Sequence, residues 1–81
     1  MQHLEFTIEP FVEGKPGRHV VAAVAAATDL GVDVDFGPFG SSCTVDAALM
    51  PDLVAAVVRA AFSNGATHVN LDVSAEPGGT G

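Results

Sequence analysis

Residues 36–44, Phe-Gly-Pro-Phe-Gly-Ser-Ser-Cys-Thr, constrain the fold most, because they place a tight turn between two short apolar runs. Gly37 and Gly40 tolerate positive φ and Pro38 fixes its own φ, so residues 37–40 predict a rigid turn. The segment therefore predicts an antiparallel hairpin. The hydroxyl residues that begin its second strand also make it a candidate rim for a small-molecule site, with a purely structural turn as the alternative.

Alternating and helical patterns account for the rest of the folded chain. Strands are predicted where apolar and polar residues alternate, and helices where apolar residues recur at helical spacing. The predicted elements are strands at 3–9, 32–36, about 41–45 and 68–73 and helices at 18–30 and about 46–63. The order β-α-β-β-α-β is that of the split βαβ unit. We therefore expect an α+β, ferredoxin-like sandwich, with an antiparallel sheet in the order 4-1-3-2 and both helices on one face.

The limits of the domain and of its helices also have sequence signals. Residues 1–74 are expected to form a single domain and residues 75–81 a disordered tail. Gly31 and Asn64-Gly65 are placed to end the two helices. Asp46 is a candidate cap of the second helix, which can hold Pro51 only in its first turn. The residues expected on the inner helix faces are Val20, Val21, Val24, Ala27 and Thr28, then Leu53, Val57, Ala60 and Ala61.

Charge and composition argue against several classes of function. The 81 residues carry a net charge of −7 with only three bases, whereas nucleic acids and anionic membrane surfaces require clustered Lys and Arg. The acidic balance is compatible with a cationic ligand. The single cysteine, Cys43, excludes an intrachain disulfide and a CxxC motif. The three histidines show no metal-ligand spacing and are expected at the surface: His3, His19 and His68.

The location and the core of the protein follow from similar arguments. The start Met-Gln-His lacks the charged and apolar regions of a signal peptide, and the Ala-rich segment 22–27 is too short to span a membrane. We therefore expect a cytoplasmic protein with no nucleic-acid or membrane partner. Apolar residues make up 48% of the chain, but most are Ala and Val. Such a core buries little area, which favours a homo-oligomer.

The predicted sheet has one polar face, which points away from the helices. Its expected members are Glu5, Thr7, Glu9, Ser42, Thr44, His68, Asn70 and Asp72. Cys43 alternates with two of them and is expected in the core. Asp33 and Asp35 are interpreted as solvated charges of an edge strand. An ordinary solvated sheet face is the alternative to a binding site here.

Three segments resemble the small thiamine-binding protein family. They are Glu5-Phe6-Thr7-Ile8-Glu9-Pro10, Gly37-Pro38-Phe39-Gly40-Ser41 and Gly65-Ala66-Thr67-His68-Val69. The resemblance covers about residues 4–73, and its hairpin motif is the most specific part. It implies a ferredoxin-like fold, dimers or tetramers, and binding of thiamine or its hydroxymethylpyrimidine part without catalysis. Ser41-Ser42 stand where relatives often carry Thr, and Pro51 lies where relatives are plainly helical.

The resemblance favours a ligand site on the polar face. Thiamine has a cationic thiazolium, which suits a carboxylate or an aromatic face, and a flat aminopyrimidine that needs hydrogen bonds and a stacking surface. The expected ligand-binding residues are Glu5, Thr7, Phe39, Gly40, Ser41, Ser42, Thr44, Asn70 and Asp72. No catalytic residue, metal or cofactor besides this ligand is expected.

Two other functions stay open. An oligomeric interaction module without a small ligand fits the Ala- and Val-rich core. An acylphosphatase-like enzyme could use Gly14-Lys15-Pro16-Gly17-Arg18 before a helix as a phosphate site, but the third strand lacks the Asn that this chemistry needs. The oligomer expectation rests further on the last strand, residues 67–73, whose single acidic residue leaves a sheet edge open to a second copy. Phe39, at the hairpin tip, is expected to reach that copy.

Overall fold

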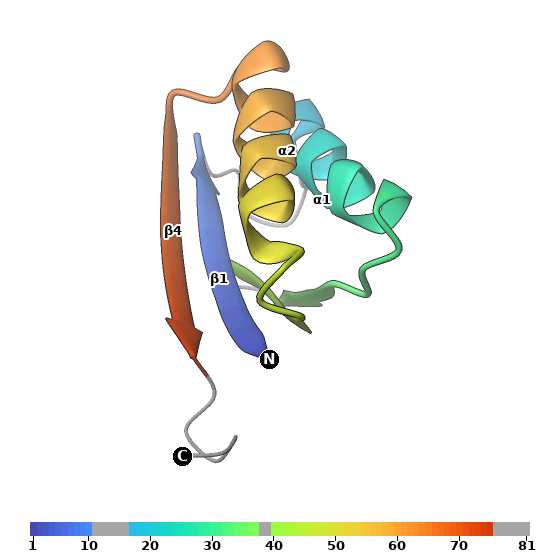
Figure 1. The fold of residues 1–81 in the computed structure, drawn as a ribbon. Coiled ribbons are helices and arrows are strands. Elements are labelled where there is room, and N and C mark those ends of the chain that lie inside the picture. Colours follow the sequence, from blue (N-terminus) through green and yellow to red (C-terminus); the bar gives the residue numbers. More distant parts are fainter. Residues whose placement is uncertain (11–16, 38–39, 76–81) are drawn as a thin grey trace.

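The computed structural model describes residues 1–10, 17–37 and 40–75. Figure 1 shows the elements in the order expected from the sequence. They are β1 (Gln2–Glu9), α1 (Arg18–Asp29), β2 (Asp35–Gly37), β3 (Gly40–Val45), α2 (Met50–Ser63) and β4 (His68–Ala75). Ala75, expected in the tail, is therefore the last residue of β4. Pro38, Phe39 and the rest of the predicted tail, 76–81, lie outside the described residues.

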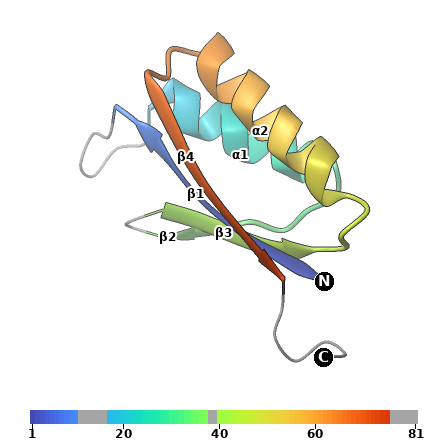
Figure 2. The same ribbon diagram turned by 60° about the vertical axis from the view of Figure 1, so that its left-hand side comes forward.

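The sheet is antiparallel and has the order β2-β3-β1-β4, which confirms the predicted 4-1-3-2 arrangement. Gln2–Phe6 of β1 pair with β3, and all eight residues of β1 pair with β4. Both helices cover the same face of the sheet (Figure 2). The α+β ferredoxin-like fold is thus confirmed, and the opposite sheet face is free of helices.

The core lies between this sheet and the two helices. Leu4, Phe6 and Ile8 of β1 are buried, in step with the alternation of the sequence. Leu53, Val57 and Ala61 of α2 pack over them and are fully buried. Cys43 and Val45 of β3 and Met50 complete the layer with small α1 residues. Within the described residues, no helix is long and apolar enough to cross a membrane.

Both helices end in the same hydrogen-bonded turn around a glycine. Gly31 and Gly65 have φ of 82° and 102°, a region that side chains rarely adopt. The Val32 and Ala66 N–H groups donate to Ala27 and Ala61 carbonyls at 3.2 and 3.0 Å. This pattern is the Schellman motif, which satisfies carbonyls left free at a helix end. The predicted helix ends are therefore confirmed.

The buried face of α1 matches the predicted one in part, since Ala27 is buried and Val20 packs against the core. The buried residues are His19, Ala23 and Ala27, whereas Val21 is 55% exposed and Thr28 is exposed. The reason is that α1 lies against α2, and small alanines let two helices approach closely. Thr28 instead donates its hydroxyl to the Val24 carbonyl at 3.0 Å.

Two strand and helix limits are also shorter than expected. β2 begins at Asp35 and not at Val32, because the Val32 N–H completes the end of α1. α2 begins at Met50, with Pro51 in its first turn as required. Asp46 is not its cap. The Asp46 carbonyl accepts hydrogen bonds from the Leu49 and Met50 N–H groups at 2.9 and 3.2 Å, in a turn that precedes the helix.

His19 is not a surface residue, contrary to the sequence-based prediction. It is 7% exposed, and its Nε2 lies 2.6 Å from the carbonyl oxygen of Pro10. Because a carbonyl only accepts, Nε2 carries the proton in this bond. Gly17 leaves room for the ring, since a Cβ at that position would overlap it. The bond satisfies the buried imidazole and ties the first turn of α1 to the end of β1.

Candidate functional site

The strand register arranges the free sheet face into two neighbouring rows. Asp35 pairs with Ser42, Ser42 with Glu5, and Glu5 with Asp72. These four residues, one from each strand, form the carboxylate row. The glycine row lies next to it and contains Gly37, Gly40, Thr7 and Asn70, with Gly37 paired to Gly40 and Thr7 paired to Asn70. The predicted polar face therefore exists, and its order across the sheet is fixed by pairing.

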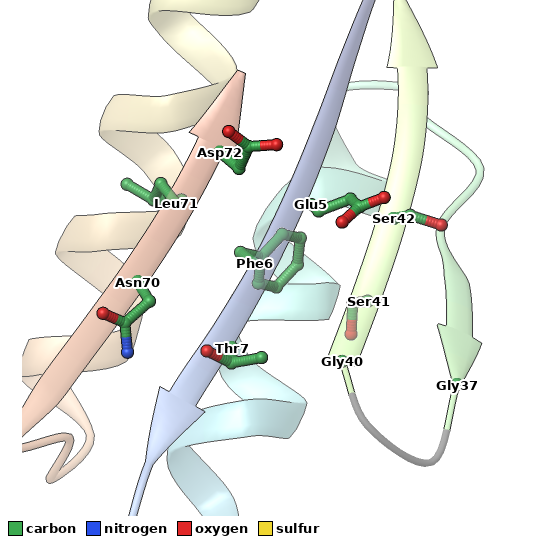
Figure 3. A pocket seen from close by; sticks show the side chains of 10 residues that line it. All are labelled: Glu5, Phe6, Thr7, Gly37, Gly40, Ser41, Ser42, Asn70, Leu71 and Asp72. Carbon is green, nitrogen blue, oxygen red and sulfur yellow. The ribbon is translucent and has the colours of Figure 1, made fainter. Parts of the chain in front are cut away.

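A hollow of about 450 Å³ lies over these rows. Its lining residues are Glu5, Phe6, Thr7, Gly37, Gly40, Ser41, Ser42, Asn70, Leu71 and Asp72. Figure 3 shows them on β1, β3 and β4 and at the end of β2. The volume is within the range of small-molecule sites, roughly 300–1,000 Å³. Because no element of the described residues covers this face, the hollow they form is open on one side.

The two glycines account for the shape of this hollow. Without side chains, Gly37 and Gly40 leave a floor of bare backbone beside the polar groups of β1 and β4. A Cβ at Gly40 would lie 3.0 Å from Thr7 Cγ2 and 3.2 Å from the Phe6 carbonyl oxygen. A Cβ at Gly37 would lie 3.1 Å from the Gly40 carbonyl oxygen. The close approach of the strands thus leaves little room for a side chain at Gly37 or Gly40, and a flat ring could lie against this backbone.

Two acidic residues occupy directly opposite positions at the edge of the hollow, and Figure 3 shows the Glu5 carboxylate turned toward β3. Glu5 and Asp72 are directly opposite on β1 and β4, and both are exposed. Like charges in this position destabilise a sheet. The nearest described basic group to Glu5 is His3, whose Nε2 lies 3.4 Å from the Glu5 carboxylate. A bound cation would relieve the repulsion between Glu5 and Asp72, so the hollow favours a positively charged ligand.

Thr44 lies on the same face but not in the lining of the hollow. Its Oγ1 is 3.1 Å from Nδ1 of His3, the residue opposite it on β1. Since His3 contacts Glu5 through its other ring nitrogen, Thr44 can orient Glu5 only through His3. The sequence-based prediction did not include His3. Its place two residues before Glu5, on the same strand face, was the available signal.

Amide and hydroxyl groups lie at the glycine end of the hollow. Asn70 is opposite Thr7, and its Nδ2 donates a weak hydrogen bond to Glu9 at 3.5 Å. The Asn70 Oδ1 and the Thr7 hydroxyl can therefore accept hydrogen bonds from a ligand. Figure 3 shows Ser42 on the other side of β1, beside the Glu5 carboxylate, with its hydroxyl directed away from β1. These groups could recognise a polar heterocycle.

The predicted site residues fall into three groups: those that line the hollow, Thr44, which does not line it, and Phe39, which lies outside the described residues. The hollow brings together Glu5, Thr7, Gly40, Ser41, Ser42, Asn70 and Asp72. Ser41 is 6% exposed and alternates with Ser42, so its side chain belongs to the helix-facing side of β3. Phe39 lies outside the described residues. The sequence-based prediction missed Gly37, although it lies in the hairpin motif, and the inward-facing Phe6 and Leu71, which only the fold places here.

The remaining titratable groups of the described residues do not form a second centre. Asp33 and Asp35 are exposed, and Asp35 belongs to the carboxylate row without lining the hollow. Cys43 is buried in the core as predicted, and desolvation raises the pKa of its thiol. Among the described residues, no group of three or more His, Cys, Asp or Glu side chains is arranged to hold a metal ion.

Comparison with known proteins supports the fold alone. No family model matches the chain, and no curated protein matches its sequence. A domain of unknown function, DUF77, from Bacillus cereus has a similar structure, with a TM-score of 0.69 and 19% identity, over 94% of this chain and 76% of that one. A crystal structure of a protein from Streptococcus pneumoniae has a TM-score of 0.65 and 14% identity, over 98% and 91% of the two chains.

Proposed function

We propose that this protein binds thiamine or its hydroxymethylpyrimidine part, without catalysis, in the hollow of the free sheet face. One observation carries the proposal. A cavity of suitable volume has a bare glycine floor and, at its edge, carboxylate residues at opposite positions of β1 and β4 that no described lysine or arginine neutralises. A flat cation with polar ring substituents is complementary to that combination. The resemblance of the hairpin and of β1 to thiamine-binding proteins points to the same ligand class.

The chemistry of the ligand suits the two rows. The thiazolium would lie near Glu5 and Asp72, where a positive charge offsets their repulsion. The aminopyrimidine would lie over Gly37 and Gly40, with its amino group and ring nitrogens within reach of hydroxyl and amide groups of the lining.

The proposal includes a homo-oligomer, a dimer or a tetramer. A site that buries most of a small ligand is concave, whereas this hollow is open on one side, so a second subunit would supply the missing wall. The core of α1 is made of Ala23 and Ala27, which supports stabilisation by association. A cytoplasmic location is also proposed, since the only cysteine is a free buried thiol.

Titration calorimetry with three compounds tests the proposal: thiamine, hydroxymethylpyrimidine and acetyl phosphate. Saturable heat with thiamine or hydroxymethylpyrimidine, and none with acetyl phosphate, is the expected result. A parallel melting experiment should show stabilisation, about 2.7 kcal/mol at a hundredfold excess over Kd. If none of the three compounds produces saturable heat, ligand binding is contradicted and an interaction module is favoured. Turnover of acetyl phosphate would contradict the absence of catalysis.

A further inference from the structure

A second and smaller cavity, the recess, lies behind the glycine row on the helix side of the sheet. Its volume is about 40 Å³. Three residues line the recess and not the hollow: Ile8, Val20 and Phe36. The other lining residues belong to both cavities: Phe6, Thr7, Gly37, Gly40 and Ser41. Because this lining is shared, a substituent of a molecule bound in the hollow can extend into the recess.

The recess exists because neighbouring strands end at different points. The pairing of β1 with β3 stops at Phe6 and Ser41. β3 begins at Gly40, whereas β1 continues along β4 as far as Glu9. Among the described residues, Ile8 has no partner on the β3 side. The sheet therefore has a notch beside Gly40, and the free face and the helix side meet there.

Apolar side chains form most of the wall of the recess. Phe6 and Ile8 are buried core residues of β1, and Val20 packs against the core from α1. Phe36 is 50% exposed, so an apolar group in the recess would cover part of its ring. About 10–15 Å³ is enough for one water molecule. The recess therefore suits a group the size of a methyl, whereas a ring is too large for it.

Ser41 supplies a hydroxyl at the boundary between the two cavities. Its residue is 6% exposed, and Figure 3 shows it beside Gly40 at the start of β3. The hydroxyl makes no hydrogen bond to another described residue, and no described side-chain oxygen is both sealed off and unpaired. The Ser41 oxygen is therefore reachable from the cavities that it lines. It can donate a hydrogen bond to a ring nitrogen, which would satisfy a largely buried polar group.

We propose that the recess and the Ser41 hydroxyl form a subsite for the edge of a heterocycle that carries a methyl group beside a ring nitrogen. The inference rests on the proposed function and specifies which part of the ligand enters first. In hydroxymethylpyrimidine, the methyl group is on the carbon between the two ring nitrogens. The opposite ring carbon carries the hydroxymethyl group or, in thiamine, the link to the thiazolium. A methyl group in the recess therefore directs the thiazolium across the glycine floor toward the carboxylate row.

Calorimetry on the full chain with three pyrimidines tests the subsite. The compounds are hydroxymethylpyrimidine, its analogue with hydrogen in place of the methyl group, and its analogue with propyl in that place. One methylene-sized group in an apolar pocket changes affinity by about 10–200-fold, so loss of the methyl group should weaken binding about tenfold. The propyl analogue should bind at least tenfold more weakly, because the recess cannot hold it. Equal affinities would overturn the subsite and leave the proposed function standing, whereas no binding by any compound would overturn both.

A filling variant tests the recess itself. Val20→Ile adds one methyl group to its wall, and Val24→Ile is the matched control, since Val24 is one turn further along α1 and does not line the recess. Val20→Ile should abolish the preference for the methyl compound over the hydrogen analogue, and Val24→Ile should retain it. A preference that survives Val20→Ile, or that is lost in both variants, would overturn the subsite.

Two further measurements locate the two parts of the subsite. Ser41→Ala should weaken the methyl compound and the hydrogen analogue alike, about fivefold, because the hydroxyl contacts the ring nitrogen and not the methyl group. Unchanged affinities would refute the role of Ser41. In the wild type, nuclear Overhauser effects should connect the ligand methyl group with the methyl groups of Val20 and Ile8. Effects confined to Thr7 would place the methyl group on the free face and overturn the inference.

Discussion

Replacing Glu5 by Gln should change stability and ligand affinity in opposite directions. Glu5 and Asp72 are directly opposite on neighbouring strands, which puts their Cβ atoms about 5 Å apart. Two unit charges about 6 Å apart repel in water by about 0.7 kcal/mol, which is an upper bound here because the Glu5 carboxylate is turned toward β3 (Figure 3). Both carboxylates are exposed, and salt screens such charges. Glu5→Gln should therefore stabilise the free protein by about 0.5 kcal/mol at low salt, or about 2–4 °C in melting temperature.

The same substitution removes one of two charges that would face a cationic ligand. The affinity for thiamine should fall about tenfold, the equivalent of about 1.4 kcal/mol. The affinity for hydroxymethylpyrimidine, which has no thiazolium, should change less. The assays are thermal unfolding at low and at high salt, and calorimetry with both ligands.

Glu9→Gln is the matched control. Glu9 is on the same strand and the same face, but it faces His68 instead of a carboxylate. It should therefore give no stabilisation and no selective loss of thiamine. Destabilisation by Glu5→Gln at low salt would refute the repulsion argument. Equal losses of both ligands would show that Glu5 does not face the positive charge.

Three further predictions concern positions where the structure leaves little freedom. Gly40→Ala should lower stability by about 1–3 kcal/mol in urea unfolding, because its Cβ meets Thr7 and the Phe6 carbonyl, and should also weaken thiamine binding; unchanged values for both would contradict the glycine floor. Gly17→Ala should displace the His19 ring and cost about 1–3 kcal/mol through the lost hydrogen bond to Pro10, whereas wild-type stability would show that the ring can move freely. Cys43 should react slowly with a thiol reagent in the folded protein. Since its folded-state pKa is raised by burial, stability should fall as pH rises past the ordinary thiol pKa, and a pH-independent melting temperature across that range would argue against its burial.

Local patterns in the sequence determine the element order and most of the sheet. The alternation of Leu4, Phe6 and Ile8 predicts which face of β1 is buried, because side chains of a strand alternate by geometry. Gly31 and Gly65 mark the helix ends, because a helix commonly ends on a residue with positive φ. The strand order follows from two right-handed crossovers. Each of these rules acts over a few residues or on connectivity alone.

The buried face of α1, by contrast, is only partly determined by the local sequence. Valines at helical spacing suggested one stripe, but close packing against α2 selects the alanines and leaves Val21 exposed. His19 is buried because the Pro10 carbonyl, distant from it by nine residues, is available to its ring. Neither outcome follows from hydrophobicity, since both depend on which groups another element brings near.

The candidate site likewise combines features that the sequence predicts with features that only the tertiary structure decides. Glu5, Thr7, Ser42, Asn70 and Asp72 could be assigned to one sheet face from alternation alone. Their order in two rows, the opposition of Glu5 and Asp72, and the bare glycine floor beside them depend on the register between strands that are far apart in sequence. Register is decided by backbone pairing and by the packing of the whole buried face, and these are properties of the tertiary structure.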